Sequence, residues 1–167
     1  YPVVTPLAVD SGHPFPFLAN NTINAIVRIF QVQPDGTKDY KIAILPIPSV
    51  LDRIIEVPSS SNKVHRFVYL EDVISYYAIQ FFQGYGIEES MIFRLTRDAD
   101  LEIDEEDAKD LLTEVEASLR RRRRGDAVRL EVVGAGSPEL LRTVLASVEL
   151  EEKDVYHIDG HLDCRMY

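Results

Sequence analysis

The chain has 167 residues, of which 46% are apolar and 28% are charged, and its formal net charge is −10. This length and composition fit one folded domain, and the acidic balance argues against a protein that binds nucleic acid or an anionic membrane. No apolar run reaches the roughly 18–20 residues of a transmembrane helix, so the sequence predicts no membrane span. Cys164 is a single cysteine without an internal disulfide partner, which favours the cytoplasm. Because the first residue is Tyr1, we expect a piece of a longer protein.

Residues 1–22 are predicted to form an extended arm that is continuous with the domain and lies on its body. Four prolines fall in this segment, and proline fixes φ and lacks an N–H donor, which excludes a regular helix or a central strand. Phe15 and Phe17 are apolar enough to be buried against the sheet or a neighbouring subunit. The arm is therefore expected to contribute to stability.

Six segments have the composition and the alternation of β-strands. In the clearest of them, Leu130 and Val132 alternate with Arg129 and Glu131, a period of two that places apolar side chains on one face of a strand. The predicted strands are residues 26–32 and 40–47, joined by a turn at 34–36, and residues 64–70, 91–96, 127–133 and 154–158.

Three segments have the 3.6-residue period of helices. The first runs from Glu71 towards Gly84, the second follows Asp104 and ends before Gly125, and the third has Ser137 as its N-cap. Strands and helices interleave without strict alternation. The sequence therefore predicts an α+β fold, in which helices pack on a mixed β-sheet.

Residues 98–124 form the most charged stretch. Residues 98–116 contain ten acids and one lysine, and Arg120 to Arg124 follow as five consecutive arginines. A calcium loop is excluded, because Ile103 and Lys109 stand where that loop needs a glycine and a bidentate glutamate. Acids near the start of a helix and bases near its end suit the helix dipole, and we favour this explanation over a metal or partner site.

The five arginines fan around the helix axis, since successive side chains are about 100° apart. A solvated helix end or a salt-bridged subunit contact is therefore favoured over a phosphate cradle. The residues of this possible contact are Arg120, Arg121, Arg122, Arg123 and Arg124.

No other motif has the neighbours that catalysis or metal binding needs. The glycines at 134 and 136 lie where a dinucleotide fingerprint would begin, but Glu139 would repel a pyrophosphate, so we expect a plain turn. His157 and His161 have the spacing of a zinc helix, which Gly160 interrupts. The remaining candidates lack an activating partner in sequence: His13, His65 and Cys164. We expect no catalytic, cofactor-binding or metal-binding residue in this chain.

Two segments resemble the middle, or head, domain of the bacterial polyphosphate kinases that work through a phosphohistidine. They are residues 13–20 (HPFPFLAN) and 93–106 (FRLTRDADLEIDEE), and the likeness continues at 70–74, 82–85, 127–131, 137–141 and 155–160. The resemblance implies that residues 23–167 are this head domain, with a fold similar to that of phosphohistidine phosphatases. The sequence departs from the usual pattern at 161–167, which leaves the boundary with the next domain open.

The resemblance also implies the function of a parent enzyme. Such a kinase transfers the terminal phosphate of ATP reversibly onto polyphosphate with magnesium, and ATP, magnesium and the phosphorylated histidine belong to its other domains. The head domain is expected to be non-catalytic, to contact those domains and to help subunits pair as a homo-oligomer. The parent is expected in the cytoplasm, with membrane association left open. The alternative is a free-standing small enzyme that handles a phosphohistidine.

Overall fold

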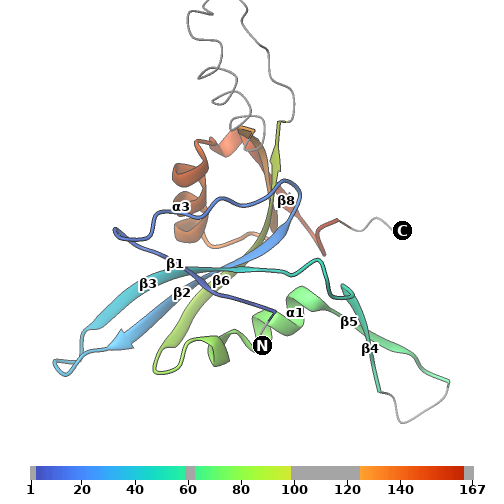
Figure 1. Ribbon diagram of the computed structural model, residues 1–167, viewed down its shortest axis with the longest axis horizontal. Helices are drawn as coiled ribbons and strands as arrows, with labels where there is room; N and C mark the ends of the chain where they lie inside the picture. Colours follow the sequence, from blue (N-terminus) through green and yellow to red (C-terminus); the bar gives the residue numbers. More distant parts are fainter. Residues whose placement is uncertain (1–2, 59–62, 99–124, 164–167) are drawn as a thin grey trace, which may run out of the picture.

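A mixed six-stranded β-sheet lies at the centre of the computed structural model, which describes residues 3–58, 63–98 and 125–163 (Figure 1). The strand order is β1-β3-β2-β6-β7-β8, and all neighbours are antiparallel except β7 and β8. The strands are β1 (Leu7–Val9), β2 (Ile23–Val32), β3 (Lys38–Pro46), β6 (Gly86–Arg97), β7 (Ala127–Val133) and β8 (Val155–Ile158). The predicted α+β class is confirmed.

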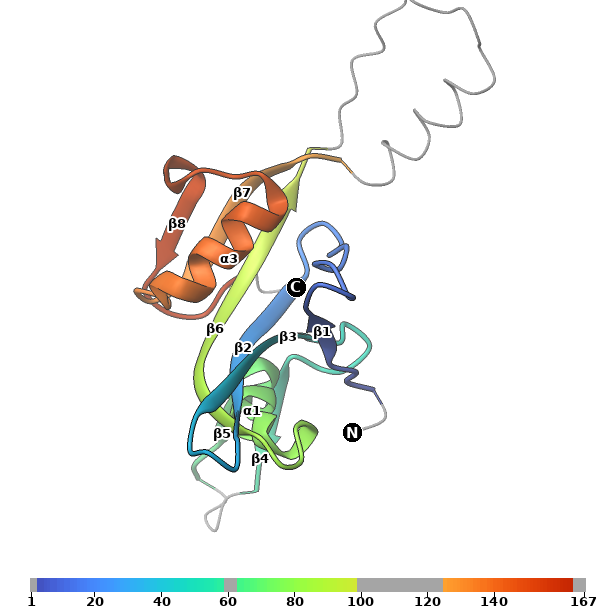
Figure 2. The ribbon, with the colours of Figure 1, turned by 90° about the vertical axis from the view of Figure 1, so that its left-hand side faces the viewer.

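Both faces of the sheet are buried where β2 runs through its middle. Ile26 packs on one side in the core under α3 (Pro138–Val148), and Val27 packs on the other side under α1 (Leu70–Tyr76) and the 3₁₀ helix η1 (Ala78–Phe81). Figure 2 shows α3 in front of the sheet and α1 behind it. Because both faces are covered, β2 is an almost continuous apolar run instead of an alternating one.

A second, two-stranded sheet stands apart from the first. It consists of β4 (Ile54–Val57) and β5 (Arg66–Tyr69), which pair antiparallel and lead directly into α1 (Figure 1). The sequence predicts β5 but not β4, although each strand has four residues. An isolated two-stranded hairpin is marginally stable in water, so β4 and β5 depend on their contacts at the root of the hairpin.

The helices agree with the prediction at one position and differ from it at another. α3 begins as expected, since the Ser137 side chain accepts a hydrogen bond from the Leu140 N–H at 3.2 Å. The first predicted helix is shorter than expected: α1 ends at Tyr76 and η1 follows. Aromatic and β-branched residues fill this stretch and have low helix propensity. The second predicted helix, at 104–124, lies outside the described residues. No helix in the described ranges is long and apolar enough to span a membrane.

Within residues 3–22, the arm lies against the body of the domain. β1 pairs with β3 at the edge of the sheet, a place where a proline-rich segment can still form a short strand. Leu18 is only 3% exposed and Phe15 packs against the core under α3. Phe17 is not buried against the sheet: it is 49% exposed, with the Arg97 guanidinium 4.5 Å from its ring centroid. Its contact with another subunit stays a prediction.

The end of β6 and the start of β7 are joined by hydrogen bonds between residues 97–98 and 125–126, and we call this place the neck. The Asp98 N–H donates to the Asp126 carbonyl at 2.8 Å, and the Arg97 guanidinium donates to the Gly125 carbonyl at 2.8 Å. Gly125 has a φ of +40°, and a Cβ there would collide with the Asp98 carbonyl. Only glycine therefore fits at this close approach of two backbones.

Leu18 is predicted to be the residue that anchors the arm. Leu18→Ala should lower the free energy of unfolding by about 2–5 kcal/mol, because it leaves a cavity in the core. Phe17→Ala should cost less than about 1 kcal/mol, since half of that ring faces water. Urea denaturation of the two variants measures both values, and equal losses would contradict this account of the arm.

Candidate functional site

Three of the four histidines lie apart from one another. The His13 ring is 3.0 Å from the Asp10 carboxylate, the His65 ring is 2.7 Å from Glu56, and the His157 ring is 3.0 Å from a backbone carbonyl. The hydrogen bonds with the His13 ring and the Gly12 N–H lower the pKa of Asp10. Within residues 3–58, 63–98 and 125–163, no three His, Cys, Asp or Glu side chains are placed to hold a metal ion.

The N-terminus of α3 holds carboxylates that belong to the chain itself. Gly134 and Gly136 have positive φ and form the turn that the sequence predicts. The Ser137 hydroxyl donates to the Glu89 carboxylate, and the Glu139 carboxylate pairs with the Arg28 guanidinium. The positive end of a helix dipole attracts an anion, and here Glu89 and Glu139 supply that negative charge. This agrees with the interpretation of the glycines as a turn and not a dinucleotide site.

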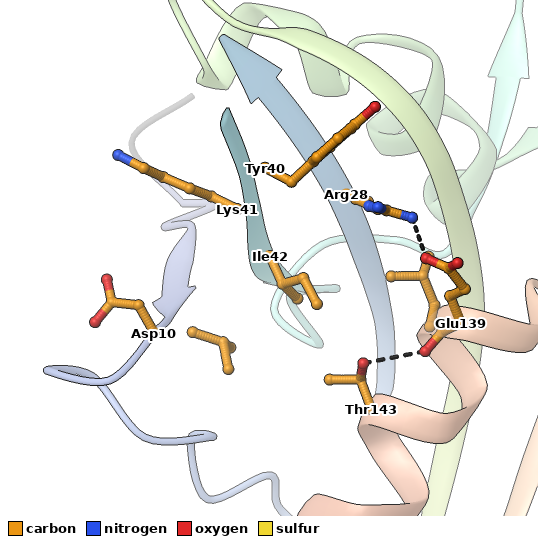
Figure 3. Close-up of a pocket in the computed structure, with 9 residues that line it drawn as sticks. Asp10, Arg28, Tyr40, Lys41, Ile42, Glu139 and Thr143 are labelled. Atoms are coloured by element: carbon orange, nitrogen blue, oxygen red, sulfur yellow. Dashed lines mark hydrogen bonds and ion pairs between the residues drawn. The ribbon is translucent and has the colours of Figure 1, made fainter. Parts of the chain in front are cut away.

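A pocket of about 400 Å³ lies beside this turn, between the arm, β2, β3 and α3. Figure 3 shows the Arg28 and Glu139 side chains pointing toward each other there. Arg28 also contacts Glu88 at 3.4 Å and Glu89 at 3.1 Å, and its guanidinium lies 4.2 Å from the Tyr40 ring centroid. The hydrogen bond to Glu89 is the main cause that raises the pKa of Arg28. With three carboxylates around it, this cation is already neutralised.

The densest polar cluster lies where residues 161–163 meet the root of the β4–β5 hairpin, which is its open end at Ile54 and Tyr69. Glu71 is 1% exposed and receives the Arg53 guanidinium at 2.6 Å. The same guanidinium donates to the backbone carbonyls of Leu162 and of Asp163, the latter at 2.6 Å. The His161 ring stacks on Tyr69, with ring centroids 3.6 Å apart.

The cluster continues across the end of the main sheet. Arg94 contacts Glu131 at 2.5 Å and the Asp163 carboxylate at 3.2 Å, and Arg129 contacts Glu131 at 2.8 Å. A pocket of about 520 Å³ lies beside these groups. We call Arg53, Glu71, Arg94, Glu131 and residues 161–163 the junction cluster.

The junction cluster is built to hold segments together, since its cations and carboxylates are already paired with each other. Sequence reasoning missed Arg53 and Glu71. Arg53 lies more than a hundred residues before the carbonyls that it binds, and no local spacing shows such a contact. One member of the cluster, His161, did stand out in the sequence, because its spacing from His157 is that of a zinc site. In the structure its ring nitrogens lie 3.7 Å from Glu71 and 3.6 Å from Asp72.

Comparison with known proteins identifies the class of molecule to which this domain belongs. A polyphosphate kinase of Halalkalibacterium halodurans is 43% identical over 164 residues, which are 98% of this chain and 23% of that protein. A polyphosphate kinase of Bacillus cereus is 42% identical over 165 residues, with the same two shares. The crystal structure of the polyphosphate kinase of Porphyromonas gingivalis has the same fold, with a TM-score of 0.71 over 96% of this chain and 22% of that chain, at 21% identity.

All of residues 1–167 match the family model of the polyphosphate kinase middle domain. The chain belongs to this family, as its resemblance in sequence predicts, and it spans about a quarter of the length of the curated relatives. The comparisons assign no role to single residues. Phe15 and Phe17 therefore stay predicted subunit contacts, and Arg120 to Arg124 lie outside the described residues.

Glu71 is predicted to be the stability-determining member of the junction cluster. Glu71→Ala should cost about 3 kcal/mol, the lower end of the range for a broken buried ion pair, because the Arg53 side chain is 26% exposed and water relieves part of the loss. Glu56→Ala is the control, since Glu56 and His65 are both mostly exposed and should cost less than about 1 kcal/mol. Chemical denaturation gives both values. Similar losses in the two variants would show that the buried pair has no special weight.

Proposed function

We propose that this chain is the assembly domain of a polyphosphate kinase, and that it contributes to subunit pairing and supplies no reacting group. The parent enzyme would transfer the terminal phosphoryl group of ATP to the end of a polyphosphate chain and release ADP. ATP and magnesium would bind to other domains of the parent, in the cytoplasm. Family membership and the share of about a quarter of the relatives' length support this proposal.

The observation that carries the assembly role is an exposed apolar face on the β4–β5 hairpin. Ile54 is 55% exposed and Phe67 is 58% exposed, and the register places them diagonally on the same face. Exposed apolar residues also lie before and after the hairpin in sequence: Val50, Leu51, Tyr76, Tyr77 and Ile79. Large exposed apolar side chains that share a face, as Ile54 and Phe67 do, are typical of protein–protein contacts, and a second subunit of the kinase is the partner that we propose.

The charged groups support a non-catalytic role. A catalytic histidine in phosphoryl transfer needs cations or N–H donors around the phosphate. His13 and His65 instead lie against the carboxylates of Asp10 and Glu56, which would repel a phosphate. Arg28 and Arg53 are bound by carboxylates as well. A free-standing enzyme that handles a phosphohistidine is therefore the less favoured candidate.

The isolated chain is predicted to be inactive. Incubation with ATP labelled in its terminal phosphate and with magnesium should yield neither labelled polyphosphate nor label on the protein. The full-length kinase is the positive control under the same conditions. Label that stays on a histidine of the isolated chain would instead support the free-standing enzyme.

Phe67→Ser is predicted to weaken subunit pairing of the full-length kinase by about tenfold or more, because removal of a buried aromatic anchor costs about 2 kcal/mol or more at an interface. Val32→Ser is the matched control, since Val32 is 60% exposed on the distant β2–β3 hairpin. Sedimentation at low and at high ionic strength measures pairing. A dimer that is indifferent to Phe67→Ser but loosened by salt would point to the arginine run in place of the hairpin.

A further inference from the structure

Arg53 joins three parts of the chain that are distant in sequence. It immediately precedes β4, and its backbone carbonyl accepts a 2.7 Å hydrogen bond from the Leu70 N–H at the start of α1. Its guanidinium binds the Glu71 carboxylate and the carbonyls of Leu162 and Asp163. The hairpin, the helix and the last described segment therefore meet at one side chain.

Residues 161–163 are held from several further directions. Leu162 is 1% exposed, the Asp163 carboxylate pairs with Arg94, and the His161 ring stacks on Tyr69 of β5. Asp163 has a φ of +50°, a conformation that residues other than glycine seldom adopt unless their surroundings fix it. The direction of the chain at this point is therefore defined by side chains and not only by its own backbone.

The chemistry of the contact requires arginine. A planar guanidinium has five N–H donors in a fixed fork, so it can bind a carboxylate and two carbonyls at once, which a lysine ammonium at the end of a flexible stem does less well. The Glu71 carboxylate is 1% exposed, and a buried charge of this kind must keep its partner in place. This favours an orienting role for the pair.

We propose that Arg53 is a positioning residue for phosphoryl transfer in the parent kinase. It fixes residues 161–163 relative to the β4–β5 hairpin, and so would hold the domain that the family resemblance implies after this one in a set orientation to the second subunit that we propose on the hairpin. The inference rests on the proposed function. Phosphoryl transfer depends on alignment, and a misplacement of about 1 Å can lower a rate by about 100-fold.

The test uses the full-length kinase with Arg53→Ala, Arg53→Lys and two controls. Arg66→Ala removes an exposed arginine from the same hairpin, and Leu18→Ala destabilises the domain away from the junction cluster. Each variant is assayed for kcat and for the KM of ATP at a temperature where circular dichroism shows it fully folded. Hydrogen exchange of the peptide that contains residues 159–163 reports on how firmly this segment is held in place.

Arg53→Ala should lower kcat by about 10-fold to 100-fold, leave the KM of ATP within about threefold, and speed up exchange only around residues 159–163. Arg53→Lys should lie between Arg53→Ala and wild type, and both controls should keep the wild-type kcat. Faster exchange with an unchanged kcat would overturn the inference and leave the proposed function intact. An equal fall of kcat in Leu18→Ala would also overturn it, since mere destabilisation would then explain the effect.

If Arg53→Ala does not fold, Arg53→Lys decides by the same criteria: a lowered kcat with unchanged KM of ATP supports the inference, and a wild-type kcat overturns it. A wild-type protein without kinase activity would refute the proposed function, and the inference with it.

Discussion

Burial of both faces of β2 is the constraint on which the rest of the molecule depends. Ala25 and Val27 face one core and Ile26 faces the other, each at 1% exposure or less. A sheet with two apolar faces must be covered on both sides, so the chain places α1 on one side of the sheet and α3 on the other. At the edges the need is for backbone partners: β1 pairs with the outer side of β3, and β8 pairs with the outer side of β7.

Two arginines of this acidic chain make contacts between segments that are distant in sequence. Arg28 joins β2 to the start of α3 through Glu139, and Arg53 joins the hairpin root to the segment after β8. Both contacts link parts of the chain that are far apart in sequence. Glu139 is 58% exposed, whereas the carboxylate that holds Arg53, that of Glu71, is 1% exposed. An arrangement that left Glu71 buried without Arg53 would be penalised, so this pair favours one packing of the hairpin on the domain.

Local pattern was enough for much of the fold and for little of the candidate site. Alternation marks β7, and Ser137 followed by a proline marks the start of α3, because both signals lie within a few residues. β4, a strand of four residues, was not predicted, whereas β5 and β8 of the same length were. Phe17 was expected against the sheet or a neighbouring subunit, and its exposed ring leaves the contact with a neighbouring subunit as the prediction. Arg53 could not be recognised at all, since its partners are set by the topology of the whole sheet. Of the histidines, which sequence reasoning examined closely, His13 and His65 pair with nearby carboxylates, whereas His161 meets Tyr69 and Glu71 from far along the chain.

The neck between Asp98 and Gly125 has a consequence for the end of the β6–β7 pair. Residues 97–98 and 125–126 lie side by side, closed by the hydrogen bond from the Asp98 N–H to the Asp126 carbonyl and by the Arg97 guanidinium. The two strands therefore end on backbone groups that already have partners, and not on a frayed edge. A side chain at Gly125 would push the Asp98 carbonyl away and open the strand pair from this end.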